Sequence, residues 1–62
     1  MEEIAKLVSR WPKDRDVPRL LLDKYVAARG SKKTKIGIYV EALLVACNTE
    51  DDVALVEEYW AS

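Results

Sequence analysis

The stretch that decides the fold runs from Ile36 to Cys47 and reads I-G-I-Y-V-E-A-L-L-V-A-C. It carries one charge in twelve residues, Glu41, whereas the segments on both sides are far more polar. Its first residues alternate in the manner of a β-strand, but its second half is rich in alanine and leucine, and the run is longer than a usual buried strand. We therefore predict a helix that is apolar on nearly all sides and that the rest of the chain must cover.

Two shorter helices are predicted before this stretch. The first has an apolar face at the helical spacing i, i+3, i+4, i+7, made by Ile4, Leu7, Val8 and Trp11. Pro12 ends this helix, because a proline disfavours helical backbone in the residue before it. The second helix begins after Asp16, which offers an N-cap carboxylate, and it carries Pro18 in its first turn and ends at Gly30.

The central helix is expected to begin at Ser31 or Thr34, either of which can cap it. A fourth helix follows Thr49, because residues 49–52 resemble a capping box in which Asp52 replaces the usual Glu or Gln. The predicted fold class is all-α: residues 1–62 form one compact four-helix domain, built from two helical hairpins around a central apolar third helix.

Charge is distributed unevenly along the 62 residues. All ten Lys and Arg residues lie between Lys6 and Lys35, so the net charge is +6 over residues 10–35 and -6 over residues 36–62. This asymmetry has two explanations, which are an anionic partner for the basic half or attraction between the two halves within the fold.

A lysine cluster at the start of the central helix is the main local anomaly. Lys32, Lys33 and Lys35 crowd a helix N-terminus, where the helix dipole favours acidic residues. They are candidates for binding an anion or a nucleic acid, and the alternative is a solvated loop or salt bridges to the acidic fourth helix. With Gly30 as the turn residue, this region resembles the helix-turn-helix of DNA-binding proteins, although the helix after Lys35 becomes apolar where a recognition helix is polar.

Composition argues against several classes of function. A single cysteine excludes an intramolecular disulfide, and the absence of histidine removes the usual zinc ligand set and the commonest general base. We expect no metal, no cofactor, no small-molecule substrate and no catalysis. No apolar run reaches the length of a membrane span, and the N-terminal sequence is unlike a signal peptide, so we expect a soluble intracellular protein, cytoplasmic in location.

The expected function is therefore that of a small non-catalytic protein-interaction module or accessory subunit. A domain of this size buries only about 60% of its unfolded surface, so part of the central helix is expected to stay uncovered and to bind a partner or a second copy. The natural anchors are the aromatic and central aliphatic residues Trp11, Tyr39, Leu43 and Trp60. The alternative function is a small helix-turn-helix DNA-binding protein that uses Lys32, Lys33 and Lys35.

Overall fold

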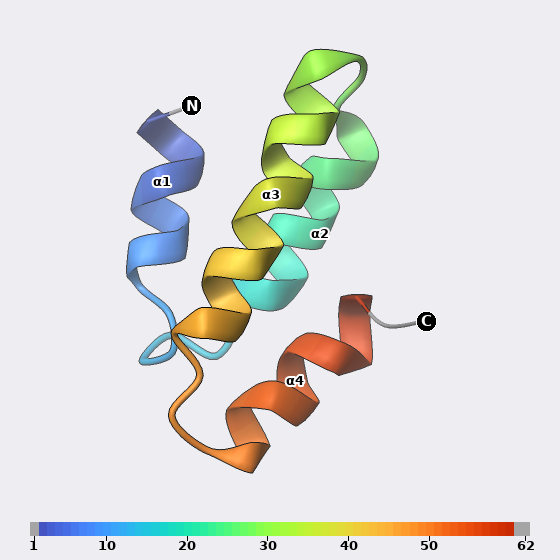
Figure 1. Ribbon diagram of the computed structural model, residues 1–62. Coiled ribbons are helices and arrows are strands. Elements are labelled where there is room, and N and C mark those ends of the chain that lie inside the picture. The colour runs from blue at the N-terminus through green and yellow to red at the C-terminus, as the bar shows by residue number, and fades with distance from the viewer. Residues whose placement is uncertain (1, 61–62) are drawn as a thin grey trace.

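A computed structural model describes residues 2–60, which form four helices (Figure 1). These are α1 (Glu2–Ser9), α2 (Val17–Ala27), α3 (Ser31–Val45) and α4 (Glu50–Trp60). The described part of the chain contains no β-strand. The all-α fold class and the predicted order of four helices are confirmed.

The middle of the molecule is a hairpin of two helices, not one helix alone. α2 and α3 run side by side in opposite directions and share the most extensive interhelical contact (Figure 1). Each of them also packs against both α1 and α4, whereas α1 and α4 do not touch each other. The flanking helices therefore lie on separate parts of the α2–α3 hairpin, and the central place that was expected of the third helix is shared with α2.

The segment between α1 and α2 is a compact turn. α1 ends at Ser9, and the chain turns over residues 10–16, where the amide of Asp14 donates to the carbonyl of Arg10 at 2.8 Å. The carboxylate of Asp14 then accepts the amide of Asp16 at 3.0 Å. Asp16 occupies the N-cap position of α2 but makes no side-chain hydrogen bond to the start of the helix, so the capping expected of its carboxylate is not formed.

The α2–α3 connection is three residues long and depends on a glycine. Gly30 has φ 64°, a left-handed conformation that a residue with a Cβ adopts at a cost. Gly30 is also the N-cap position of α3, so neither Ser31 nor Thr34 provides the side-chain cap that the sequence predicted.

The start of α4 is the capping box that the sequence predicted. The hydroxyl of Thr49 accepts the amide of Asp52 at 3.2 Å, and the carboxylate of Asp52 accepts the amide of Thr49 at 3.3 Å. The same carboxylate accepts the amide of Asn48 at 2.8 Å and forms an ion pair with Arg15, whose guanidinium lies 4.9 Å from the centre of the Trp11 ring. Asp52 is thereby fully hydrogen-bonded although it is buried.

The core is formed by all four helices, the turn that follows α1 and the α2–α3 connection. Its buried hydrophobic residues are Ile4, Leu7, Trp11, Val17, Leu21, Ala28, Ile36, Leu43 and Val56. The indole Nε1 of Trp11 donates to the carbonyl of Leu43, and the indole Nε1 of Trp60 donates to the carbonyl of Pro18 at 3.1 Å. Each tryptophan thus joins two segments that are distant in sequence.

Candidate interaction surface

One face of α3 is apolar and uncovered. Ile36 and Leu43, seven residues apart, are completely buried, and they lie on nearly the same side of the helix. Ile38 and Val45, also seven residues apart, lie on the opposite side, where their exposed fractions are 62% and 86%. Ala42, one turn after Ile38, is exposed on the same side. Glu41, one turn before Val45, is also exposed there, so Glu41 is the charged residue of an otherwise apolar surface. The incomplete cover expected of this helix is confirmed.

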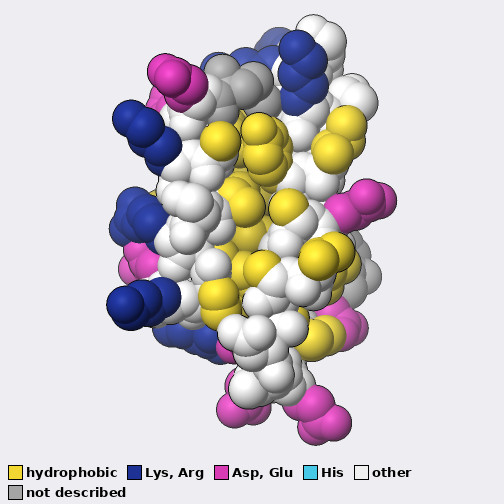
Figure 2. Space-filling view, turned by 60° about the vertical axis from the view of Figure 1, so that its left-hand side comes forward, with side chains coloured by type: hydrophobic (Ala, Val, Ile, Leu, Met, Phe, Trp, Pro, Cys, Tyr) yellow, Lys and Arg dark blue, Asp and Glu magenta, His cyan; other side chains and the backbone are white. Residues whose placement is uncertain are grey.

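The uncovered face forms part of a larger apolar strip. Figure 2 shows hydrophobic side chains gathered over α1 and α3, with most Lys and Arg along the α1 edge and at the top, and Asp and Glu at the right and lower edges and also among the basic side chains on the left. Val8 of α1 and Tyr39 of α3 are half-buried and pack against the core beneath. The strip therefore continues from the core to the surface, and charged side chains of both signs border it.

The predicted anchor residues are only partly available. Trp11 and Leu43 are core residues, with exposed fractions of 5% and 0%. Tyr39 and Trp60 are half-buried, and the Trp60 ring packs edge-on against the ring of Tyr25 at a centroid distance of 5.2 Å. The structure does not bring these four residues together on one surface.

Ile38 and Val45 were missed as anchors from the sequence. The signal that could have found them is the seven-residue spacing, because residues 36 and 43 and residues 38 and 45 are two apolar pairs on opposite sides of one helix. Both pairs are aliphatic, so the spacing alone does not say which pair faces the core.

The three lysines of the N-terminal cluster are separated in space. The ammonium of Lys33 lies 4.9 Å from the centre of the Tyr25 ring, which is a cation–π contact. Lys32 lines a cavity on a different side of α3, and Lys35 is exposed. The cluster is therefore not a single convergent anion site.

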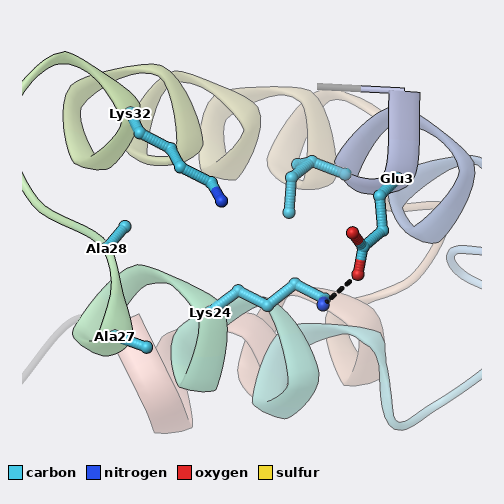
Figure 3. Close-up of a pocket in the computed structure, with 6 residues that line it drawn as sticks. Glu3, Lys24, Ala27, Ala28 and Lys32 are labelled. Carbon is cyan, nitrogen blue, oxygen red and sulfur yellow. Dashed lines mark hydrogen bonds and ion pairs between the residues drawn. The ribbon is translucent and has the colours of Figure 1, made fainter.

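The cavity at Lys32 lies between α1, α2 and the start of α3 (Figure 3). It has a volume of about 260 Å³, and Ile4, Ala27 and Ala28 are its apolar lining. Lys24 forms an ion pair with Glu3 at 2.6 Å across the cavity, and the ammonium of Lys32 points into it (Figure 3). The hydrogen bond and charge of Lys24 lower the pKa of the Glu3 carboxyl. The one carboxylate of this cavity is thus already engaged by the protein.

The two charged halves of the chain are scarcely neutralised by each other. The ion pairs within residues 2–60 are Arg10–Asp14, Arg15–Asp52, Arg19–Asp23 and Lys24–Glu3. Of these, only Arg15–Asp52 joins the basic half to α4. The salt bridges from the lysine cluster to α4, which the sequence left open, are not formed by the described residues. The molecule keeps lysines at the start of α3 and carboxylates at the start of α4.

The remaining reactive group is the cysteine thiol. Cys47 is half-buried, and its Sγ donates to the carbonyl of Leu43 at 3.2 Å. Within residues 2–60 no three Cys, Asp or Glu side chains are grouped to hold a metal ion, and no helix there has the length and apolarity to cross a bilayer.

Comparison of the chain with protein-family models, with curated proteins and with solved structures gave no match. Inference about function therefore depends on the geometry of the chain itself.

Proposed function

We propose that this chain is a small non-catalytic protein-interaction module or accessory subunit, which binds its partner through the uncovered face of α3. The observation that carries the proposal is the exposure of Ile38, in the middle of α3, and of Val45, at its C-terminal end. Complete burial of a valine or isoleucine side chain contributes about 1.5–3 kcal/mol, so covering both residues is a substantial driving force.

The surroundings of this face also suit protein binding. The half-buried Tyr39 adds an aromatic ring beside it, and charged side chains border it (Figure 2). Protein interfaces share this pattern of an apolar centre with a polar rim. The proposal includes an intracellular, cytoplasmic location, which the single cysteine favours.

Site-specific photo-crosslinking tests the proposal directly. A photoreactive residue is placed at position 45 in one variant and, as the control, at position 58, which is exposed on the acidic surface of α4. Each is exposed to an extract of the native source, and we expect discrete protein adducts from position 45 that are absent from position 58. Adding Ile38→Glu to the position-45 variant should abolish these adducts. Equal crosslinking from both positions, or none from position 45, contradicts the proposal.

The helix-turn-helix hypothesis has less support. The two helices of such a motif cross at a large angle, whereas α2 and α3 form an antiparallel hairpin (Figure 1). The exposed side of α3 also carries Ile38, Ala42 and Val45, and these residues offer no hydrogen bonds to base edges. Duplex binding at low salt that is lost on replacing Lys32, Lys33 and Lys35 by Glu would favour that hypothesis over ours.

A further inference from the structure

The apolar face of α3 lies between groups of opposite charge. Lys35 is exposed one turn before Ile38, at the basic end of the helix. Beyond Val45 the chain leaves α3 and starts α4, where Glu50 and Asp51 are exposed. Neither Lys35 nor these two carboxylates forms an ion pair within the described residues.

The face thus has a basic end, an apolar middle and an acidic end. A second copy turned end for end places its acidic end opposite the basic end of the first. α3 rises about 1.5 Å per residue, so Ile38 and Val45 are about 10 Å apart along its axis. A two-fold axis that passes between residues 41 and 42 exchanges Ile38 with Val45 of a second copy. The same rotation carries Lys35 of each copy to the level of residue 48 of the other, three residues beyond the end of α3 and two before the start of α4.

We propose that the partner of this face is a second copy of the same chain, with the two α3 helices packed antiparallel about this axis. The inference rests on the proposed function and specifies its partner. Ala42 lies beside the axis, and its small side chain permits the close helix approach of about 8–10 Å that is typical of packed helices. Such a pairing is isologous, so it closes as a dimer and does not continue into a filament.

Charge complementarity selects this occupant. In the dimer Lys35 of each copy lies at the end of the other copy where Glu50 and Asp51 start α4, which gives two equivalent sets of opposite charges. Glu41 is the exception, because it lies on the face near the axis and meets its own symmetry mate. The Lys and Arg side chains along the α1 edge (Figure 2) stay at the rim of the interface, where water screens them.

The size of the face sets the strength of the dimer. A standard interface buries roughly 800 Å² per partner, which is about a fifth of this chain's 4297 Å² of accessible surface. One helix face with its borders is smaller than that, so the dimer belongs to the weak, reversible class.

Sedimentation equilibrium with charge-reversed variants tests the dimer. We expect the wild-type chain to change from monomer to dimer as its concentration rises towards the millimolar range, with weaker association at higher salt. Lys35→Glu places like charges at both sets, and Asp51→Lys adds a positive charge that cancels the attraction of the remaining Glu50; each should raise the dissociation constant about tenfold or more. Glu41→Gln should lower the dissociation constant.

Mixing the two charge-reversed variants is the decisive experiment for the proposed charge pairing. A heterodimer of Lys35→Glu with Asp51→Lys regains one attractive set and keeps the other, so it should form at concentrations where each variant alone is monomeric. Lys35→Glu places an acid in the N-terminal half of α3 at an exposed position, and circular dichroism checks that both variants are folded.

Two results overturn the inference. The first is that the wild-type chain stays monomeric at millimolar concentration. The second is that the two charge-reversed variants form no heterodimer when they are mixed. If the chain is monomeric while position 45 still crosslinks to a different protein, the interaction module stands and only the second copy is wrong. If position 45 gives neither self-adducts nor adducts to another protein, both proposals fail.

Discussion

The indole Nε1 of Trp11 donates a hydrogen bond of 3.0 Å to the backbone carbonyl of Leu43, thirty-two residues later in the chain. The carbonyl lies in the last turn of α3, where helical carbonyls lack an amide partner from the following turn. The thiol of Cys47 is its other donor. The side chain that follows α1 therefore caps the C-terminal end of α3.

Trp11→Phe should lower the free energy of unfolding by about 1–3 kcal/mol, because it removes this donor from a buried carbonyl while keeping an aromatic ring. Urea unfolding followed by circular dichroism measures the loss. Trp60→Phe is the matched control, since its Nε1 bonds the carbonyl of Pro18 from a half-buried position. A loss from Trp60→Phe that equals or exceeds that from Trp11→Phe would contradict the capping role.

Stability should fall in acid partly through Asp52. Its hydrogen bond with Arg15, together with the amides of Asn48 and Thr49, lowers the pKa of the Asp52 carboxyl in the folded chain. A lowered folded-state pKa means that the unfolded chain binds the proton more readily. The stabilisation is therefore complete above the ordinary pKa of about 4 and is lost as the pH falls through the folded-state value.

Asp52→Asn should accordingly show a smaller drop in urea midpoint between pH 6 and pH 3 than the wild-type chain. Asp14→Asn is the comparison, because the pKa of Asp14 is also lowered, chiefly by the amide of Asp16. An unchanged pH profile for Asp52→Asn would show that the Arg15–Asp52 pair contributes nothing to acid sensitivity.

The two glycines should respond in opposite directions to alanine. Gly37 lies inside α3, and an added Cβ would meet the Tyr25 ring at 3.4 Å, an ordinary contact. Gly37→Ala should therefore stabilise the chain by about 0.5–1 kcal/mol, through helix propensity. Gly30→Ala should destabilise it by about 1–2 kcal/mol, because position 30 has positive φ. Thermal unfolding of both variants gives the signs, and two changes of the same sign would refute the assignment.

Neighbouring positions of the apolar run should differ sharply in their contribution to stability. Leu43→Ala removes most of a fully buried side chain and should lower the free energy of unfolding by about 2–5 kcal/mol. Val45→Ala, two residues later, alters an exposed side chain and should change stability by no more than about 0.5 kcal/mol. Chemical denaturation of the two variants at low protein concentration compares them in the absence of self-association. Similar losses would mean that α3 faces the core differently.

That contrast marks where prediction from the sequence ended. The apolar run, the Pro12 boundary and the Thr49–Asp52 capping box are local signals, and they gave four helices and their approximate limits. Which side of the run faces inward depends on how α1, α2 and α4 pack around it. Periodicity carries no such information for a helix that is apolar on nearly all sides.

The candidate surface was only partly accessible to sequence reasoning for the same reason. Large aromatic residues serve both cores and interfaces, so Trp11 was a reasonable anchor by type, although the structure buries it. Val45 is small and aliphatic, and nothing in its chemistry distinguishes it from Val40 on the half-buried side of the helix. The lysine cluster was visible as a charge anomaly, but its division among three directions follows from the α-helical geometry and from the placement of Tyr25 and Glu3.

The separation of α1 from α4 has a practical consequence for spectroscopy. Each end of the chain holds one tryptophan, and no other residue shares that chromophore. The fluorescence of Trp11 reports on the packing of the turn after α1 against the end of α3. The fluorescence of Trp60 reports on the packing of the end of α4 against Tyr25 and Pro18. Because the two flanking helices do not touch, single-tryptophan versions of the chain provide two local fluorescence probes, which can show whether the ends detach together or one at a time.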